Sequence, residues 1–361
     1  MAAIEECTKN FSMEDLSLWE YTNASWAFVM IFVPLVVLFG VVSNVAFIFV
    51  VYRVKFMRNI TNVYLVNLAI ADSSLLLAGL VQYIGDYVVC PEYDLRFSFH
   101  TSFGCSVPNF LIYLCYYASL WTVTLVSLER YLAVCHTFWH RAISDYSRSV
   151  KMIASIWVIS VFFASFAAPY TRITLCGVEN ELGLSAIAFS APFCEFTCGW
   201  CAAALFLTDL IQFIFTIIVN FVMYTLIVYH LGKTMFPISN DESAIQANIR
   251  AMRTRHTVAK MLVINGVLFF ICLTPFSVAN VNSLTKSFGV SVFDEESIVL
   301  LSWAGRVLFM VNSAVNPLVY NATNPRYRVA FREAFGLIKP RGNGYSQQGT
   351  ISNINSQVTK I

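Results

Sequence analysis

The chain has 361 residues, of which 58% are hydrophobic and only 12% are charged, whereas soluble domains usually contain about a quarter charged residues. Its formal net charge of +2 favours neither a nucleic acid nor an acidic substrate, so the position of each charge matters more than the total. With a mean hydropathy of +0.66, the chain is expected to have a lipid bilayer as its solvent and no nucleic-acid partner.

Residues 1–25 form a polar, acidic segment that we expect to be an extracellular tail. It lacks the basic start, apolar stretch and cleavage site of a signal peptide, so the first span is expected to insert uncleaved. Asn10 and Asn23 begin the sequons Asn10-Phe11-Ser12 and Asn23-Ala24-Ser25 and are predicted glycosylation sites.

Seven stretches are long and apolar enough to cross a membrane, which takes about 20 mostly apolar residues per helix. They cover residues 27–52, 63–88, 103–135, 150–170, 201–229, 257–284 and 297–321. Helices are expected because backbone groups in lipid must be satisfied within their own segment. The predicted fold is an all-α membrane protein, a seven-transmembrane helix bundle spanning residues 26–322.

Lysine and arginine gather in alternate loops, which predicts the orientation of the bundle. They follow spans one and seven and lie between spans three and four and spans five and six, whereas the other loops carry mostly Asp and Glu. The N-terminus is therefore predicted outside the plasma membrane and the C-terminus inside. The acidic outer loops would attract a basic ligand.

After the last span, apolar and basic residues alternate with a helical period. Residues 323–338 are therefore expected to form a short amphipathic helix on the lipid of the inner leaflet. Residues 339–361 are rich in Gly, Asn, Ser and Gln and are expected to be a disordered cytoplasmic tail.

Polar side chains inside membrane spans are costly and are functional candidates by default. Here they form an ordered series, which reads Gly40-Val41-Val42-Ser43-Asn44, Asn67-Leu68-Ala69-Ile70-Ala71-Asp72, Glu129-Arg130-Tyr131, Trp157 and Asn316-Pro317-Leu318-Val319-Tyr320. With this series the chain resembles the rhodopsin-like (class A) G-protein-coupled receptors. The resemblance implies a receptor that signals to a heterotrimeric G protein and is not an enzyme.

The resemblance assigns a switch to the inner ends of the spans. Arg130 would be held by Glu129 at rest and released toward the G protein when the helices part. Pro317 would bend span seven by removing a backbone hydrogen bond. The other predicted members of the switch are Tyr131, Tyr224, Asn316 and Tyr320.

The family also places an allosteric sodium ion in the middle of the bundle, and no other cofactor is expected. Its predicted ligands here are Asp72, Ser119 and Asn316, with Asn44 and Ser313 nearby. A buried polar network without an ion is the alternative.

The resemblance further implies that Cys105, at the outer start of span three, pairs with a cysteine in the loop after span four. Cys194 is the expected partner and Cys198 the alternative. The pairing of the other outer cysteines is left open, namely Cys7, Cys90, Cys176 and Cys201. Buried free thiols are expected at Cys115, Cys135 and Cys272.

Three positions depart from the family pattern. Leu273 stands where span six usually has a tryptophan that senses the ligand, and Thr216 where span five usually has a bending proline. Arg255 stands where some members place an acid facing the switch arginine, so Glu129 is expected to hold Arg130 alone. These changes leave open an atypical or constitutively active receptor, orphan or chemosensory.

Two ligand classes are disfavoured by single residues. Ile112 occupies the position of the aspartate that binds amines, about five helical turns outward from Arg130. Met310 occupies the position of the lysine that carries retinal. The predicted ligand-binding residues in the outer half are Gln82, Tyr83, Asp86, Tyr113, Tyr116, Tyr117, Asp209, Phe276, Asn280 and Arg306.

Arg306 carries most of the ligand prediction, because an arginine facing the bundle interior needs an anion or a carbonyl. An internal pair with Asp209 or Asp86 is the alternative. With Tyr113 and Asn312-Ser313-Ala314-Val315-Asn316-Pro317, Arg306 makes the chain resemble thyrotropin-releasing-hormone-type receptors. This resemblance implies a peptide ligand, possibly short and amidated, and Gq coupling.

Cytoplasmic partners are predicted from the tail. Ser346, Thr350, Ser352, Ser356 and Thr359 are candidate kinase sites that would recruit arrestin. The terminal Thr359-Lys360-Ile361 matches a PDZ ligand. A seven-helix transporter is the alternative from another class, although the polar residues divide into an outer and an inner group rather than one continuous path.

Overall fold

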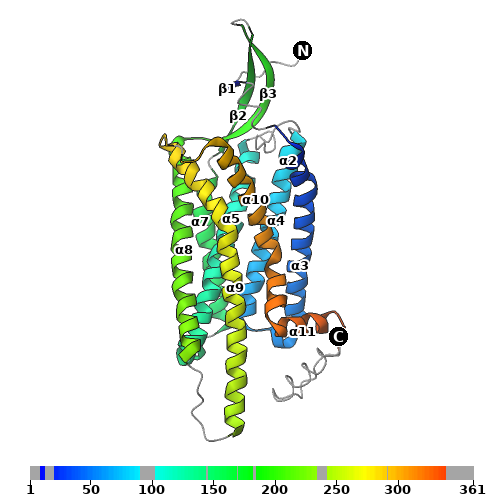
Figure 1. The fold of residues 1–361 in the computed structure, drawn as a ribbon, viewed down its shortest axis with the longest axis vertical. Coiled ribbons are helices and arrows are strands. Elements are labelled where there is room, and N and C mark those ends of the chain that lie inside the picture. The colour runs from blue at the N-terminus through cyan, green and yellow to red at the C-terminus, as the bar shows by residue number, and fades with distance from the viewer. Residues whose placement is uncertain are drawn as a thin grey trace.

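The computed structural model describes residues 9–12, 20–89, 102–143, 145–168, 170–181, 184–233, 242–290 and 292–338. Seven of its helices are long and apolar enough to cross a membrane, with spans at Asn23–Arg53, Ile60–Val88, Phe103–Cys135, Tyr146–Ala167, Trp200–His230, His256–Lys286 and Ser297–Thr323. They stand side by side as one bundle (Figure 1). The predicted seven-helix membrane fold is confirmed.

The first span is built from three consecutive helical pieces, α2 (Asn23–Ala27), the π-helix η1 (Phe28–Phe32) and α3 (Val33–Arg53). Pro34 lies in the first turn of α3, where it cannot donate to the preceding turn and its ring crowds the carbonyl four residues earlier. The wider π-helical turn just before it accommodates this misfit.

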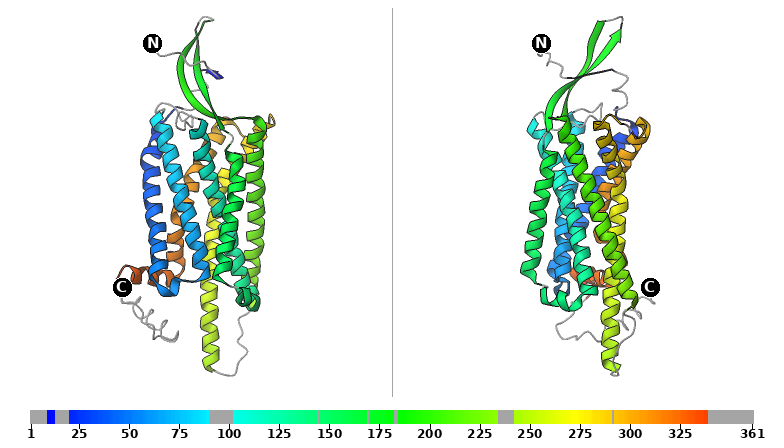
Figure 2. Two further views of the ribbon diagram at one scale, coloured as in Figure 1. Left: turned by 180° about the vertical axis from the view of Figure 1, so that it is seen from behind. Right: turned by 90° about the vertical axis from the view of Figure 1, so that its left-hand side faces the viewer.

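The short helix η2 (Lys55–Met57) leads into α4 (Ile60–Val89), α5 (Ser102–Cys135), α6 (Thr137–Ile143), α7 (Tyr146–Ala164) and η3 (Ser165–Ala167). The chain continues through α8 (Gly199–Lys233), α9 (Glu242–Ser287), α10 (Glu295–Thr323) and α11 (Pro325–Ala334). The helix α9 begins at Glu242, not at residue 257, and its inner end projects beyond the other spans (Figures 1 and 2). Apolar content marks only the part of a helix that lies in lipid, so the sequence missed this extension.

The loop after α7 contains a β-hairpin that was not predicted. Strands β2 (Tyr170–Glu181) and β3 (Leu184–Phe196) pair antiparallel, and β1 (Lys9–Ser12) adds to β2 in parallel. The sheet stands on the end of the bundle that carries the N-terminus, above the helix ends (Figure 1). We call this end the outer end. The fold is therefore all-α only within the membrane.

The C-terminal helix α11 confirms the predicted amphipathic helix after the last span. It lies across the opposite end of the bundle, at an angle to the spans (Figures 1 and 2). Asn324 caps it by accepting a hydrogen bond from the Arg326 backbone N–H at 3.0 Å. Tyr327, Ala330 and Ala334 are buried against the bundle.

Candidate functional site

A buried carboxylate, that of Asp72 in α4, lies in the middle of the bundle with no exposed surface. Its Oδ1 accepts a hydrogen bond from the Ser119 hydroxyl at 3.0 Å. Its Oδ2 accepts one from Asn316 Nδ2 at 2.6 Å, and Ser313 lies beside it. The three residues predicted to bind sodium thus meet in one cluster that joins α4, α5 and α10.

Asn44 reaches the neighbouring turn of α10 because Gly40 lets α3 and α10 approach closely. A Cβ at Gly40 would lie 2.8 Å from the Ala314 Cβ. Asn44 Nδ2 donates to the Ser313 carbonyl at 3.0 Å, and its Oδ1 is buried with no hydrogen-bond partner among the described residues. A buried acceptor of this kind suits a cation or an ordered water.

A second polar contact joins α4, α5 and α7. Asn67 Nδ2 donates to the Thr122 hydroxyl at 2.8 Å, and Trp157 Nε1 donates to Asn67 Oδ1 at 2.9 Å. The motif residues Asn67 and Trp157 therefore position three helices relative to one another.

The inner end of the bundle contains a cavity of about 460 Å³ that opens beside Arg130. Its polar lining comes from helices far apart in the sequence, namely Asn59, Thr61, Asn62, Glu129, Arg130, His140, Asn324, Arg326 and Tyr327.

Glu129 and Arg130 form no ion pair in this structure, although the two charges still interact electrostatically. Glu129 Oε1 lies 2.6 Å from His140 Nε2 in α6, and Arg130 forms no ion pair with any described residue. The Nε of Arg130 is buried without a hydrogen-bond partner in that part of the chain. The imidazole of α6 competes for the carboxylate, and the sequence did not show that α6 folds back to reach it.

The predicted switch tyrosines occupy different surroundings. The Ser127 hydroxyl donates to Tyr224 Oη at 2.8 Å, and a Cβ at Gly266 of α9 would lie only 2.0 Å from that Oη. Tyr320 is 1% exposed and packs against the Phe47 ring. Its hydroxyl has no hydrogen-bond partner among the described residues. Tyr131 lies 3.1 Å from His136.

Helix α11 closes one side of the inner cavity. The Tyr327 hydroxyl donates to Asn62 Oδ1 at 2.5 Å, and Arg326 Nη2 donates to the Phe56 carbonyl at 2.7 Å. Burial raises the pKa of Tyr327 and lowers the pKa of Arg326, though arginine stays charged. Both side chains therefore anchor α11, Tyr327 to the second span and Arg326 to η2, which joins the first two spans.

In the outer half, aromatic rings from three helices form a cluster. The rings of Phe276 and Phe309 stack with centroids 5.2 Å apart, and Tyr116 meets both at 5.9 and 5.6 Å. Tyr113 lies 6.5 Å from Phe276 and 5.9 Å from Tyr117. The predicted residues Tyr113, Tyr116, Tyr117 and Phe276 thus lie together.

Asp209 of α8 borders this cluster and is fully buried. Asn280 Nδ2 donates to its Oδ2 at 2.9 Å. Its Oδ1 has no hydrogen-bond partner among the described residues, and the nearby Tyr116 hydroxyl does not reach hydrogen-bond geometry. Asp209 therefore pairs with Asn280, and the suggested pair between Asp209 and Arg306 does not form.

Arg306 of α10 is half-buried in the outer half. Its guanidinium carbon lies 4.9 Å from the Trp303 ring centroid and 6.0 Å from that of Tyr83, which are distances of cation–π contact. Asp86 is buried on the same helix as Tyr83, and Gln82 is half-buried. Arg306 and Tyr83 thus lie together, in contact with Trp303.

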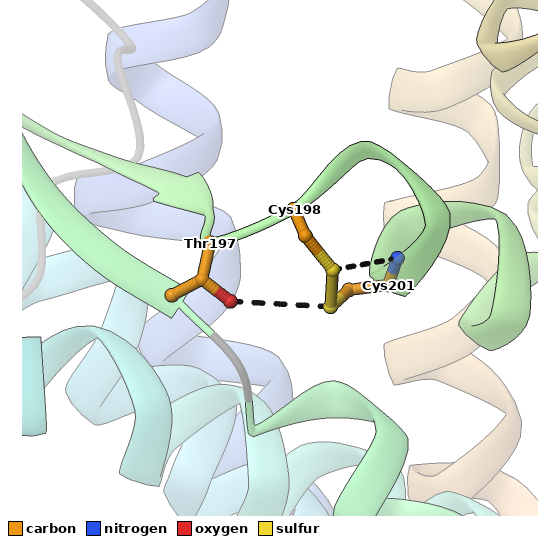
Figure 3. Close-up of a disulfide and its surroundings, with 3 residues drawn as sticks. All are labelled: Thr197, Cys198 and Cys201. Atoms are coloured by element: carbon orange, nitrogen blue, oxygen red, sulfur yellow. Dashed lines mark hydrogen bonds between the residues drawn. A yellow bond between two sulfur atoms is a disulfide. The ribbon is translucent and has the colours of Figure 1, made fainter.

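The outer disulfides differ in part from the expectation. Cys198 is bonded to Cys201, so it is not the partner of Cys105 (Figure 3). Cys105 is disulfide-bonded, but the side chain of Cys194 lies outside the described part. Free thiols are confirmed at Cys115, Cys135 and Cys272, of which only Cys115 is fully buried. The glycosylation prediction stays untested, with Asn23 exposed and the Asn10 side chain outside the described part.

Two of the departures from the family pattern have clear structural outcomes. Leu273 is 1% exposed and packs in the core with Phe269. Thr216 donates to the Gln212 carbonyl at 2.8 Å within an uninterrupted α8. The side chain of Arg255 lies outside the described part.

Sequence reasoning missed three residues of these sites, namely His140, Trp303 and Phe309. His140 belongs to no family motif. The only signal in the sequence is that a histidine in the loop after span three could hydrogen-bond a nearby acid. Trp303 and Phe309 lie one helical turn from Arg306 on the same face, so helical spacing could have found both.

Comparison with known proteins agrees with this geometry. The model of the 7 transmembrane receptor (rhodopsin family) matches residues 43–320. The thyrotropin-releasing hormone receptor of Gallus gallus is 27% identical over 344 residues, covering 88% of this chain and 81% of that receptor. Neuromedin-U receptor 2 of Rattus norvegicus is 31% identical over 307 residues, covering 82% of this chain and 72% of that receptor. The motifs, the fold and this match agree that the chain belongs to the rhodopsin family of seven-transmembrane receptors.

Proposed function

We propose that the protein is a plasma-membrane receptor, with its N-terminus outside, that binds a short peptide at the outer end and activates a heterotrimeric G protein at the inner end. The observation that carries the proposal is the inner cavity, into which Arg130 presents a guanidinium without an ion-pair partner among the described residues. An entering protein segment could supply carbonyl or carboxylate acceptors to that guanidinium.

The outer half supports a peptide ligand through two separated polar groups. Asp209 retains a buried acceptor oxygen that suits a donor group of the ligand, such as an amine or amide. Arg306 suits a carbonyl or a C-terminal amide, and the aromatic cluster between α5, α9 and α10 suits apolar side chains. Relatives of the chain are named as receptors for thyrotropin-releasing hormone and neuromedin U, which favours a peptide over an amine.

Coupling between the two ends is proposed to run through the Asp72 cluster. Asp72 contacts α5 and α10 directly, and the orphaned Oδ1 of Asn44 lies at the next turn of α10. These oxygens fit a sodium ion that favours one arrangement of the helices. Gq is the proposed G-protein class, with arrestin and a PDZ protein as partners of the tail and lipid as the partner of α11.

A constitutively active receptor is a second candidate, and one observation favours it. Arg130 forms no ion pair with Glu129 in this structure, and Leu273 stands where the family usually has a ligand-sensing tryptophan in span six. Such a receptor would show G-protein activation without any peptide.

The test is nucleotide exchange on purified Gq, Gi and Gs heterotrimers with the receptor in nanodiscs, with and without a library of short amidated peptides. We expect exchange with at least one heterotrimer, and Arg130→Ala should abolish it while peptide binding persists. Exchange without peptide would support the constitutive candidate. Solute flux in vesicles without exchange on any heterotrimer would overturn the proposal in favour of a transporter.

The peptide site is tested separately with Arg306. Replacing Arg306 by Ala removes a charged hydrogen-bond donor, so peptide potency should fall about tenfold to a hundredfold. Lys286→Ala, at the exposed outer end of α9, is the matched loss of charge and should leave potency nearly unchanged. Equal effects of the two variants would mean that Arg306 acts only through the general outer charge.

A further inference from the structure

A four-residue disulfide loop joins the hairpin to the fifth span. Strand β3 ends at Phe196 and α8 begins at Gly199, and the linking sequence is Cys198-Gly199-Trp200-Cys201. The two cysteines are bonded to each other across a sequence separation of 3 (Figure 3). This bridge is distinct from the disulfide of Cys105, and the proposed receptor function does not use it.

The two sulfur atoms lie in different surroundings. Cys198 is half-exposed, whereas Cys201 is buried at 8% exposure. The Cys201 backbone N–H, in the first turn of α8, donates to Cys198 Sγ at 3.2 Å. Thr197 Oγ1 lies 3.9 Å from Cys201 Sγ (Figure 3). The more exposed of the two cysteines is therefore also the one whose sulfur accepts a hydrogen bond from a helix N-terminal amide.

We propose that Cys198–Cys201 is a thiol-exchange site, at which extracellular low-molecular-weight thiols of the glutathione class reversibly modify Cys198. A glutathione thiolate attacks Cys198 Sγ and forms a mixed disulfide, while the bond to Cys201 breaks and Cys201 leaves as a thiolate that takes a proton from water. A second glutathione attacks the glutathione sulfur of the adduct. It releases oxidised glutathione and the Cys198 thiolate, so two thiols supply the two electrons that reduce the bridge.

Three features favour exchange at this bridge. Exchange needs access to one sulfur, and Cys198 is the more exposed of the two cysteines. The thiolate that forms at Cys198 is stabilised by the Cys201 amide and by the N-terminal end of a 35-residue helix. A bridge that closes a loop of only four residues also removes little entropy from the open chain, so it resists reduction less than one that closes a long loop.

The position of the bridge indicates what exchange would change. Only Thr197 and Cys198 lie between the end of β3 and the start of α8, and the hairpin stands directly on this end of the bundle (Figure 1). The bridge therefore constrains the base of the hairpin. Opening it frees the base of the hairpin, while the β2–β3 pairing itself stays intact. Thiol conditions outside the cell would thereby alter how the hairpin stands over the outer end of the bundle.

The test uses the full-length receptor in nanodiscs, equilibrated in glutathione buffers from oxidising to reducing, then alkylated, digested and analysed by mass spectrometry. We expect Cys198–Cys201 to open at glutathione concentrations at least about tenfold lower than the Cys105 bridge, with the glutathione adduct on Cys198. Opening no earlier than the Cys105 bridge, or an adduct mainly on Cys201, would overturn the proposal. No peptide or G protein is involved, so the outcome is independent of the proposed receptor function.

Two single variants compare the reactivity of the two cysteines within the same protein. Cys201→Ser leaves Cys198 as a free half-exposed thiol. Its thiolate should attack oxidised glutathione, accumulate as the Cys198–glutathione mixed disulfide and release one reduced glutathione. Cys198→Ser leaves the buried Cys201 and should react at least about tenfold more slowly. Hydrogen exchange of β2 and β3 identifies any variant that fails to fold. Equal reaction rates in two folded variants would show that the asymmetry of the site has no chemical consequence.

Discussion

Asp72 and Asp209 are both carboxylates without exposed surface, yet their surroundings differ. Both oxygens of Asp72 accept hydrogen bonds, from Ser119 and Asn316. Only one oxygen of Asp209 does, from Asn280, and the other has no partner among the described residues. A buried acceptor left without a donor costs free energy. Under the proposed function the second oxygen of Asp209 would accept from a ligand donor, whereas Asp72 joins α4, α5 and α10.

Removing the charge of each carboxylate alone tests this difference and has the largest expected effect. Asp209→Asn should lower peptide potency about tenfold, because one charge-assisted hydrogen bond to the ligand is lost, and should leave the response to sodium unchanged. Asp72→Asn should do the reverse, abolishing the effect of sodium on basal nucleotide exchange. Both are measured by nucleotide exchange in sodium and in N-methylglucamine buffers.

The alternative outcome is easily recognised. If both variants lost the sodium effect and the peptide response together, the two carboxylates would belong to one coupled site. The assignment of one to the ligand and the other to the helices would then fail.

A second prediction compares packing at two glycines. A Cβ at Gly266 would overlap the Tyr224 hydroxyl, whereas at Gly79 it would meet only Met310 Cε at 3.6 Å. Gly266→Ala should therefore destabilise the receptor by about 1–3 kcal/mol through overpacking and break the Ser127–Tyr224 bond. Gly79→Ala is the matched control, and it should be neutral or slightly stabilising because alanine favours the helix.

Thermal unfolding of the two variants in detergent checks this contrast. A melting temperature for Gly266→Ala equal to that of Gly79→Ala would mean that Tyr224 moves aside without loss. Tyr224 would then be loosely held, and its predicted role in the switch would lose its structural basis.

Contacts in the middle of the bundle could be predicted from the sequence more completely than contacts in the outer half. The Asp72 cluster and the Asn67–Trp157 contact follow from polar residues on known spans, because a buried polar group in lipid must find a partner and few are within reach. The contacts of Arg306 with the rings of Trp303 and Tyr83 could be predicted only in part. They depend on side-chain directions around α10, which a list of spans does not contain.

Elements outside the membrane were predicted least. The hairpin of β2 and β3, the inner extension of α9 and the contact of His140 with Glu129 all lie in loops or beyond the apolar windows. There the apolar period no longer distinguishes helix from strand or connection. The pairing of Cys198 with Cys201 was not predicted, because the family resemblance implies only the bridge of Cys105.

A third prediction concerns the inner carboxylate, Glu129, which resembles Asp72 in being held by a protein donor. His140→Ala removes that donor and leaves Glu129 free to pair with Arg130, so basal nucleotide exchange should fall about twofold to fivefold. Adding Glu129→Gln to the same chain removes the competing charge and should restore exchange. A rise in basal exchange with His140→Ala alone would instead show that α6 holds the receptor at rest.

The smallest expected effect concerns a carboxylate in water, at the opposite limit from Asp72 and Asp209. Asp294 is fully exposed and caps α10, its Oδ2 accepting the Ser297 N–H at 3.0 Å. This hydrogen bonding lowers the pKa of Asp294, so its stabilising contribution is present above the unfolded-state pKa and is lost as the pH falls through the folded-state value. Asn is an equally good cap that does not titrate. The melting temperature of the native receptor minus that of Asp294→Asn should therefore decrease as the pH is lowered from 5 to about 3. A difference that stays constant over this range would show that the cap does not depend on the charge.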